Sequence, residues 1–287
     1  MNFKALKRRL DGYPNAKRAL SYLRYRSEAW HCLTAVSGGR QTGPVLFTTQ
    51  KCASTFITQA LKVVQSEYRL RACNLEGFFW QTRGLDTKAH LQRDADKLFS
   101  GARTIFAPIR DYVKIKNEEH RSIVLMLRDP RDVLVSAYYS VSFSHVLPGG
   151  AEAQQRFSQL RKRALEMTLD EYVIFALDEY LPKYMDYARH LLGRPNVTFV
   201  TYEEMATDFT SWADKFLAGL GLETRDDAIS KLRAVYLSGA PASGIEDTTS
   251  HRRQGRPGDF RRKLSGSTIA VLNERLDDVM SIYGCWE

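Results

Sequence analysis

Two short polar segments carry the residue types that bind anions. The first reads QKCASTF and contains Lys51, Ser54 and Thr55. The second reads RDPRDVLVS, with Arg128 at its start and Ser136 at its end. An ammonium or guanidinium group beside hydroxyl donors suits a phosphate group, whose oxygens carry negative charge and accept several hydrogen bonds. Both segments are therefore candidates for binding a phosphate-bearing ligand.

Each segment joins a predicted strand to a predicted helix. Residues 43–49 and 123–127 are apolar runs of the kind found in strands that a parallel sheet buries on both faces. Helical spacing follows from residue 54 and from Pro130, where Asp129 is a suitable N-cap. The N–H groups and dipole at a helix N-terminus attract anions, and open α/β sheets bind ligands at the carboxyl ends of their strands. The pattern predicts an anion site after each strand.

In this order, the two segments resemble those of the cytosolic sulfotransferases, which use 3′-phosphoadenosine 5′-phosphosulfate (PAPS) and release 3′-phosphoadenosine 5′-phosphate (PAP). That family holds the 5′-phosphosulfate with a lysine-containing loop after its first strand. It holds the 3′-phosphate with an arginine at a strand end and a serine eight residues later. The resemblance assigns Arg128 and Ser136 to the 3′-phosphate, and Lys51 to both cofactor binding and catalysis. It assigns to the cofactor the rest of the first loop, namely Cys52, Ala53, Ser54, Thr55 and Phe56.

Two further segments are similar to the same family. The stretch NVTFVTYEEM is similar to the strand whose tyrosine lies near the adenine, here Tyr202. The stretch RQGRPGDF is similar to the C-terminal loop that encloses the 3′-phosphate. The residues of this loop assigned to the cofactor are Arg253, Gln254 and Gly255. Three places in these segments depart from the family pattern. Gln254 replaces a Lys or Arg, Cys52 and Ala53 replace a Ser-Gly pair, and Phe56 replaces a tryptophan that stacks on the adenine, although a phenylalanine can still stack.

The catalytic base is the part of the family pattern that this sequence lacks. The family has a histidine about two dozen residues before the 3′-phosphate arginine, whereas residues 103–111 read RTIFAPIRD. Removal of the acceptor proton then needs another group. His145, after the predicted 3′-phosphate helix, is the first candidate for this base, and Glu76 and Asp111 are the alternatives. Arg110 is a candidate for binding an anionic acceptor.

Two other functions stay open. The same loops could serve an ATP-dependent small-molecule kinase, although residues 50–56 contain none of the glycines of a Walker A loop. A nucleotide-binding module without catalysis would explain the missing histidine and the basic N-terminus. The three functions differ in whether PAP, ATP or an oligonucleotide stabilises the protein.

The positive charge of the chain is concentrated in two segments. The net charge is +9, and residues 1–30 contain eight Lys and Arg against two acids, while residues 251–263 contain six against one. The second cluster suits a lid over a polyanionic cofactor. The first is interpreted as the solvated face of a packed helix, with an anionic membrane surface or an acidic partner as alternatives. Nucleic acid is not expected as a partner; the expected partner is a small-molecule acceptor.

Composition and element order predict a single α/β domain with a mostly parallel central sheet flanked by helices, the P-loop-like sulfotransferase fold. Residues 41–287 would form this domain and residues 1–40 a basic helical segment packed on it. The four cysteines lack the spacing of a metal site or a disulfide framework. We therefore expect no metal, reduced thiols and a cytoplasmic enzyme that is a monomer or a homodimer.

Four expectations concern local structure. Residues 67–100 are expected to be irregular, and Gly149 and Gly150 to open a mobile flap beside the acceptor pocket. The sequence TLDE at residues 168–171 predicts a capping box that begins a helix, which should end before Pro182. Residues 267–282 are expected to form one final helix.

Overall fold

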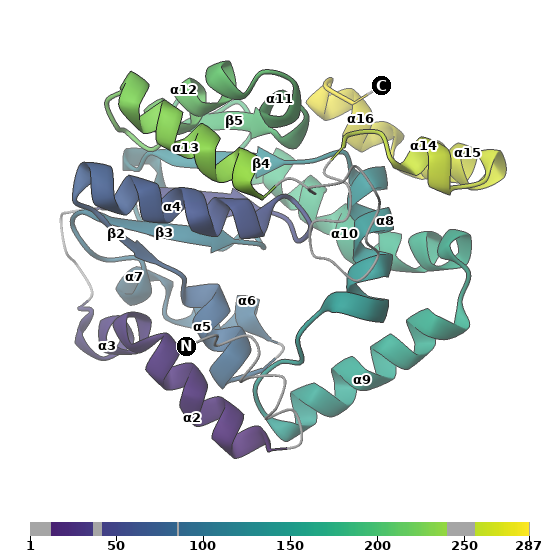
Figure 1. Ribbon diagram of the computed structural model, residues 1–287, viewed down its shortest axis with the longest axis horizontal. Helices are drawn as coiled ribbons and strands as arrows, with labels where there is room; N and C mark the ends of the chain where they lie inside the picture. The colour runs from purple at the N-terminus through teal and green to yellow at the C-terminus, as the bar shows by residue number, and fades with distance from the viewer. Residues whose placement is uncertain (1–12, 37–41, 85, 240–255, 287) are drawn as a thin grey trace.

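The computed structural model describes residues 13–36, 42–84, 86–239 and 256–286. Within them, the centre of the fold is a parallel sheet of five strands in the order β2-β3-β1-β4-β5 (Figure 1). The strands are β1 (Val45–Thr48), β2 (Arg71–Cys73), β3 (Thr104–Ile109), β4 (Ile123–Leu127) and β5 (Val197–Thr201). The predicted α/β class with a mostly parallel sheet is confirmed.

The inner strands β3, β1 and β4 are buried along their whole length because helices cover both faces of the sheet. Successive side chains of a strand point to opposite faces, so Val45 and Phe47 pack on one face and Leu46 on the other. The same alternation separates Leu125 from Val124 in β4. This double burial is why these strands are continuously apolar in sequence.

The helices form two layers around the sheet (Figure 1). One face is covered by α4 (Ser54–Tyr68), α12 (Phe209–Gly219) and α13 (Asp226–Ser238). The other is covered mainly by α5 (Leu75–Thr82), α8 (Pro130–Tyr139), α10 (Leu169–His190) and α16 (Asp277–Tyr283). The remaining described α-helices are α2 (Pro14–Arg24), α3 (Arg26–Thr34), α6 (Thr87–Arg93), α7 (Ala95–Leu98), α9 (Ala151–Glu166), α11 (Tyr202–Thr207), α14 (Phe260–Lys263) and α15 (Gly266–Arg275).

The parallel arrangement brings the two predicted anion loops to one edge of the sheet. β1 pairs with β4 without interruption, from Val45 opposite Ile123 to Thr48 opposite Met126. Because both strands run in the same direction, the loops that follow them leave the sheet side by side. Each loop then begins a helix, α4 after β1 and α8 after β4.

Residues 67–100 are regular rather than irregular, which corrects the sequence-based expectation. They contain the end of α4, strand β2 and helices α5, α6 and α7. Side chains cap two of these short helices, because Asn74 accepts a hydrogen bond from the backbone of Gly77 (2.8 Å) and Asp86 from that of Ala89 (3.2 Å). Elements this short show too few turns for a clear hydrophobic period, which is why the sequence pattern misses them.

The expected end of the helix that begins at residue 168 is wrong. The capping box of Thr168 and Glu171 is present, but the helix it begins runs through Pro182 to His190. Pro182 is exposed, while Tyr180, Tyr184 and other tyrosines bury the opposite side of α10. This packing outweighs the hydrogen bond that the proline removes.

The predicted flap after Gly150 and the predicted single C-terminal helix are also corrected. Residues 151–166 form α9, which buries Ala153, Phe157 and Ala164 at helical spacing. The C-terminal segment divides into α15 and α16 at Leu276, which is fully buried. Tertiary packing of apolar side chains decides the structure in both places.

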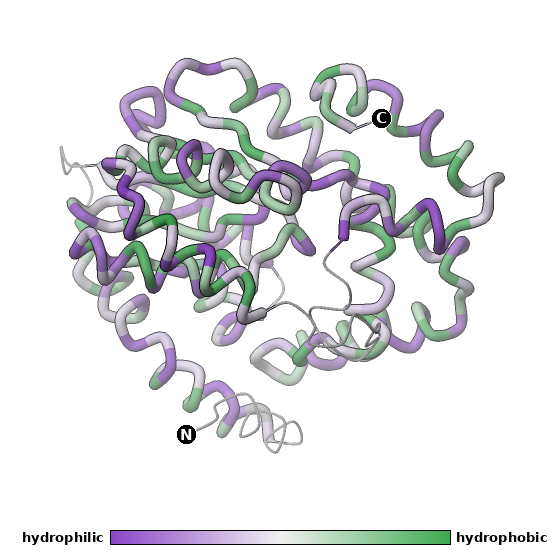
Figure 2. The backbone as a smooth tube through the Cα atoms, turned by 45° about the horizontal axis from the view of Figure 1, so that its top comes forward, coloured by the Kyte–Doolittle hydropathy of each residue, from purple (hydrophilic) through white to green (hydrophobic). Residues whose placement is uncertain are grey.

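Helices α2 and α3 lie against α5, where the ring of Phe78 contacts those of Tyr22 and Tyr25. The hydropathy of α2 alternates along the helix (Figure 2), as expected for a helix with one packed side. Lys17 is fully buried, although the sequence predicted a solvated basic face, while Arg18 and Arg24 are exposed as expected. No helix in the described parts of the chain combines the length and apolar content needed to cross a membrane.

Candidate active site

The loop between β1 and α4 has an unusual backbone. Lys51 and Ala53 both adopt left-handed conformations, with φ of 67° and 49°. Residues with a Cβ atom avoid this region at a cost of about 1–2 kcal/mol each. Such conformations gather at ligand-binding loops, where surrounding structure holds them. The loop thus turns sharply without glycine and leads directly into the N-terminus of α4 at Ser54.

The side chains of this loop point in different directions. Ser54 is partly exposed and Thr55 is exposed, at the positive end of the α4 dipole. Cys52 instead points into the core, where its thiol donates to the carbonyl oxygen of Met126 at 3.5 Å. Burial raises the pKa of the Cys52 thiol to about 12. Cys52 can therefore contribute to an anion site through its backbone but not as a thiolate.

Arg128 connects three of the predicted segments. Its guanidinium forms an ion pair with Asp132 (3.0 Å) and donates to the carbonyl oxygen of Lys51 at 3.5 Å. It also lies over the ring of Tyr202, 4.3 Å from the ring centre. Burial opposes its charge, but the neighbouring carboxylates of Asp132 and Glu203 favour it, and the pKa of Arg128 is raised. The arginine is thus a fixed cation at the carboxyl end of β4.

Asp132 anchors the start of the C-terminal region, a role that the sequence interpretation missed. Its two carboxylate oxygens accept hydrogen bonds from the backbone N–H groups of Gly258 (2.8 Å) and Phe260 (3.0 Å). Arg128 donates to the carbonyl oxygen of Arg256 at 3.4 Å. The spacing of Arg128 and Asp132, four residues apart next to a predicted helix, was the available signal. The predicted cofactor residues Arg253, Gln254 and Gly255 lie outside the described residues.

The helix that carries Ser136 begins as the sequence predicted. Asp129 caps α8 by accepting from the backbone N–H of Arg131 at 2.9 Å. The Arg131 side chain is paired with the same carboxylate and stacks on Phe260, 4.2 Å from the ring centre. Arg131 is therefore a structural residue. Ser136 lies half-buried two turns after Arg128.

Phe56 and Tyr202, assigned to the adenine by resemblance, are both buried. The Phe56 ring packs against Trp212 and Tyr236, at centroid distances of 5.7 and 5.5 Å. Tyr236 is a neighbour of Phe56 that the sequence interpretation did not single out. Burial raises the pKa of Tyr202 to about 12, so its hydroxyl stays protonated. Stacking of Phe56 on an adenine remains a prediction.

Two of the candidate bases lie beside the end of β3 as partners in ion pairs. Both oxygens of Glu76 bind Arg110, one through the backbone N–H (2.5 Å) and one through the side chain (3.0 Å). Asp111 pairs with Lys183 at 2.8 Å. Arg110 is therefore held by Glu76, and its binding of an anionic acceptor stays a prediction.

His145 follows the π-helical turn (Ser140–Ser144) after α8. Its ring stacks on Phe157, with centroids 5.1 Å apart, and meets the edge of Trp80 at 5.7 Å. The three rings come from different elements, since Trp80 lies on α5 and Phe157 on α9. His145 thus lies in an aromatic cluster, and its role as the base stays a prediction.

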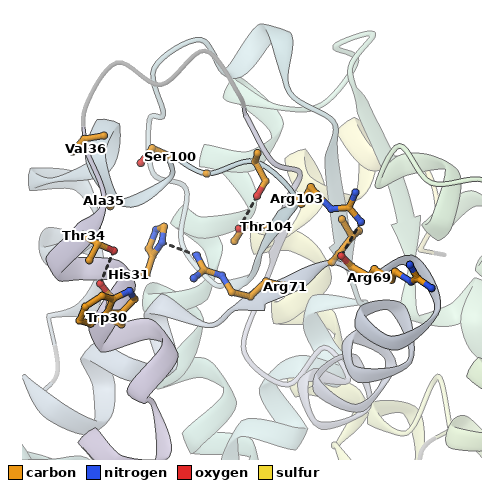
Figure 3. A pocket seen from close by; sticks show the side chains of 13 residues that line it. Trp30, His31, Thr34, Ala35, Val36, Arg69, Arg71, Ser100, Arg103 and Thr104 are labelled. Atoms are coloured by element: carbon orange, nitrogen blue, oxygen red, sulfur yellow. Dashed lines mark hydrogen bonds between the residues drawn. The ribbon is translucent and has the colours of Figure 1, made fainter.

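A wide hollow of about 820 Å³ lies at the opposite, amino end of the sheet (Figure 3). Its lining includes Trp30, Arg69, Arg71 and Arg103. The sequence interpretation assigned no role to this region. The described residues also include no group of three or more His, Cys, Asp or Glu side chains placed to hold a metal ion.

Comparisons with known proteins show which folds and families this chain resembles. Among solved structures, the chain is similar to mouse sulfotransferase SULT7A1 complexed with PAP, with 16% sequence identity and a TM-score of 0.57, over 85% of this chain and 86% of that chain. Retinol dehydratase in complex with androsterone and the inactive cofactor PAP matches with 17% identity and a TM-score of 0.49, over 83% and 80% of the two chains. No curated protein matches the sequence.

The likeness to the mouse enzyme shows a shared fold, the P-loop-like fold that the sequence resemblance implied. The family itself is shown by sequence. A family model described as the sulfotransferase domain matches residues 43–284, which is most of the chain and includes all the segments from which the resemblance was inferred. This chain therefore belongs to the sulfotransferase family.

Proposed function

We propose that this protein transfers the sulfuryl group of PAPS to a hydroxyl or an amine of a small-molecule acceptor and releases PAP. The observation that supports this most directly is the meeting of two cationic loops, where the Arg128 guanidinium lies 3.5 Å from the carbonyl oxygen of Lys51. PAPS carries anionic groups at its 5′ and 3′ positions, which matches two adjacent cationic loops. ATP has no 3′-phosphate for the second loop to bind.

Lys51 and the N-terminus of α4 would bind the 5′-phosphosulfate in this proposal. As the sulfuryl group leaves, negative charge grows on the 5′-phosphate oxygen that held it. A lysine and a helix N-terminus fixed beside that oxygen stabilise the charge in the transition state. Ser54 and Thr55 add hydroxyl donors. Arg128 and Ser136 would bind the 3′-phosphate and set the register of the nucleotide.

Titration calorimetry with PAP, ATP and a single-stranded oligonucleotide tests the cofactor. We expect PAP to bind at least about tenfold more tightly than ATP, because charge-assisted hydrogen bonds to the 3′-phosphate are worth about 1–3 kcal/mol. Equal affinity for PAP and ATP would contradict the proposal. Transfer of radiolabelled sulfate from PAPS to a panel of phenols, alcohols, amines and sugars then identifies the acceptor class.

We also propose that the basic N-terminal segment, residues 1–40, packs on the domain formed by residues 41–287 and contacts anionic membrane surfaces weakly. Large apolar side chains and arginines are exposed on α2 and α3, including Leu23, Trp30, Leu33, Arg18 and Arg26. Tryptophan and basic side chains together favour a membrane interface. Sedimentation with phosphatidylserine-containing vesicles should exceed that with neutral vesicles, and equal sedimentation would contradict the contact.

A cytoplasmic location and a monomeric or homodimeric state complete the proposal. All four cysteines are free thiols, as is usual in a reducing compartment. Fractionation of the source cells and analytical ultracentrifugation test the two statements. Disulfide-linked protein in an oxidising compartment, or an assembly larger than a dimer, would contradict them.

A further inference from the structure

The middle of α10 is fixed against the carboxyl edge of the sheet. The buried hydroxyl of Tyr187 donates to the carbonyl oxygen of Thr48, at the end of β1, over 2.6 Å. The buried hydroxyl of Tyr184 donates to the carbonyl oxygen of Arg128, just after β4, over 2.5 Å. Burial raises the pKa of both tyrosines far above the ordinary range, so both remain donors. α10 is thus held at the point where the two anion loops begin.

Lys183 lies on the same part of α10 and reaches two loops at once. Its ammonium is 2.8 Å from Oδ1 of Asp111, which follows β3, and 3.3 Å from Oε1 of Gln50, which follows β1. Gln50 immediately precedes Lys51. Only 13% of the Lys183 side chain is exposed. A nearly buried ammonium therefore connects the candidate phosphosulfate loop with a candidate base.

Stability alone gives little reason for a lysine at this position. Removing an ammonium from water costs several kcal/mol, and an ion pair with one carboxylate often fails to offset that cost. Replacing both partners of such a pair by apolar side chains of similar volume is often neutral or stabilising. Active sites, by contrast, are places where buried ionisable groups and specific charge partners are arranged for chemistry. The placement of Lys183 thus favours a role in the reaction.

Asp111 also differs from Glu76 in the use of its oxygens. Both oxygens of Glu76 already accept hydrogen bonds from Arg110. Of the two carboxylate oxygens of Asp111, Oδ1 alone has an ion-pair or hydrogen-bond partner among the described residues, and this partner is the ammonium of Lys183. Oδ2 is therefore left to accept a proton, while Oδ1 fixes the orientation of the carboxylate. A base needs this combination of fixed geometry and one available oxygen.

We propose that Lys183 is a positioning residue for sulfuryl transfer and that it acts through Asp111. This inference rests on the proposed function. As the acceptor oxygen bonds to sulfur, the acceptor O–H bond breaks and its proton passes to Asp111. The S–O bond to the 5′-phosphate breaks, and its electron pair remains on the leaving phosphate oxygen near Lys51. Because Lys183 contacts both Asp111 and Gln50, it fixes the position of the base relative to this loop during the transfer.

The test compares Lys183→Met and Lys183→Arg with a matched control. Lys88→Met serves as the control because Lys88 also pairs with an aspartate of α10, Asp186 (3.2 Å), but is exposed. We expect Lys183→Met to lower kcat roughly 10- to 100-fold, as for a misplaced catalytic group. PAP affinity should change less than about threefold, since no phosphate contact is lost. Lys183→Arg should recover part of kcat, and Lys88→Met should retain it.

A double-mutant cycle with Asp111→Asn separates positioning from a merely structural role. If Lys183 acts through Asp111, Lys183→Met in the Asp111→Asn background should lower kcat less than about threefold further. PAPS turnover is measured with the acceptor panel and with water as acceptor, and thermal unfolding confirms that each variant is folded. An undiminished kcat in Lys183→Met, a full additional loss in the double variant, or an equal loss of PAP affinity would overturn the inference. Absence of PAPS turnover by the wild type would overturn the proposed function, and this role with it.

Discussion

The two ends of helix α4 both lie beside basic side chains, but they use them in opposite ways. At its N-terminus, Lys51 precedes the first turn, and Arg128 approaches the same loop. At its C-terminus, Arg103 donates to the carbonyl oxygens of Tyr68 (3.3 Å) and Arg69 (2.9 Å). The polarity of the helix explains the difference, because its N-terminus attracts anions and its C-terminus attracts cations. The charge of Arg103 is therefore already used by backbone carbonyl groups of the protein and not by a ligand.

The hollow at the amino end of the sheet illustrates the same contrast (Figure 3). It is large and lined by several arginines, but Arg103 caps α4 and Arg71 donates to His31 at 2.7 Å. At the carboxyl end, the loops instead lead into the N-termini of α4 and α8. The size of a hollow and its charge are thus poorer guides to chemistry than the direction of the helices around it.

The largest effect that this contrast predicts concerns Lys51. Lys51→Met should lower sulfuryl transfer by roughly two to three orders of magnitude, the usual scale for losing one donor to a charge that grows in the transition state. PAP affinity should fall less than about tenfold, because the hydroxyls and backbone of the loop remain. Steady-state kinetics and calorimetry measure the two quantities. Arg103→Met, at the other end of α4, is the control and should leave turnover unchanged.

Two outcomes would contradict this assignment of Lys51. If the variant loses affinity for PAP as strongly as it loses turnover, the lysine anchors the cofactor and does not stabilise the transition state. If turnover survives in full, the loop after β1 is not the phosphosulfate site.

Arg128 should give the next largest effect. Arg128→Lys keeps a charge but loses the planar guanidinium, and we expect PAP to bind about 10- to 100-fold more weakly, which corresponds to about 1–3 kcal/mol. Binding of adenosine 5′-phosphosulfate, which lacks the 3′-phosphate, should change much less. The ratio of the two affinities within one variant is independent of any general loss of stability. An equal loss for both ligands would remove Arg128 from the 3′ side, and Ser136→Ala provides a second, smaller test.

The strand–helix junctions were predictable from sequence because their signals are local. β4 is a continuous apolar run, and Asp129 and Pro130 mark the start of α8 within three residues of the end of β4. The α/β class follows from the same patterns. Lys51 and Arg128 could therefore be placed at the carboxyl edge of one sheet before the structure was known.

The surroundings of these residues were not predictable, because they depend on contacts between distant segments. The Lys183–Asp111 pair joins α10 to the loop after β3, and no local pattern links the two residues. Pro182 also hid this contact, since a proline is expected to end a helix, whereas packing of the tyrosine face keeps α10 continuous. The inward direction of Cys52 is likewise set by a distant partner, the carbonyl oxygen of Met126.

At the C-terminus of α4, the expected effect is on stability alone. Arg103→Met should lower the free energy of unfolding by about 0.3–1 kcal/mol, the range for a cation near helix carbonyls on the surface. Urea unfolding measures this loss. Turnover per folded molecule should equal that of the wild type. A tenfold loss of turnover would contradict the contrast between the two ends of α4, because it would show that the C-terminus of α4, at the amino end of the sheet, takes part in the reaction.

The smallest expected effect is a pH dependence of stability at His31. Arg71 can only donate, so Nδ1 of His31 accepts its hydrogen bond and Nε2 carries the proton that is donated to the carbonyl oxygen of Leu98 (2.8 Å). Burial, followed by the charge of Arg71, lowers the pKa of His31 below its ordinary value of 6.5. In the unfolded chain the imidazole then takes a proton at a higher pH than in the fold, so this part of the stability is lost as pH falls below about 6.5.

His31→Gln can donate to Leu98 and accept from Arg71 without titrating. We therefore expect the wild type to lose more unfolding free energy than His31→Gln when the pH is lowered from 7.5 to 5. Turnover per folded molecule should be equal in both proteins. A difference that stays constant with pH would show that His31 is not held neutral by its neighbours.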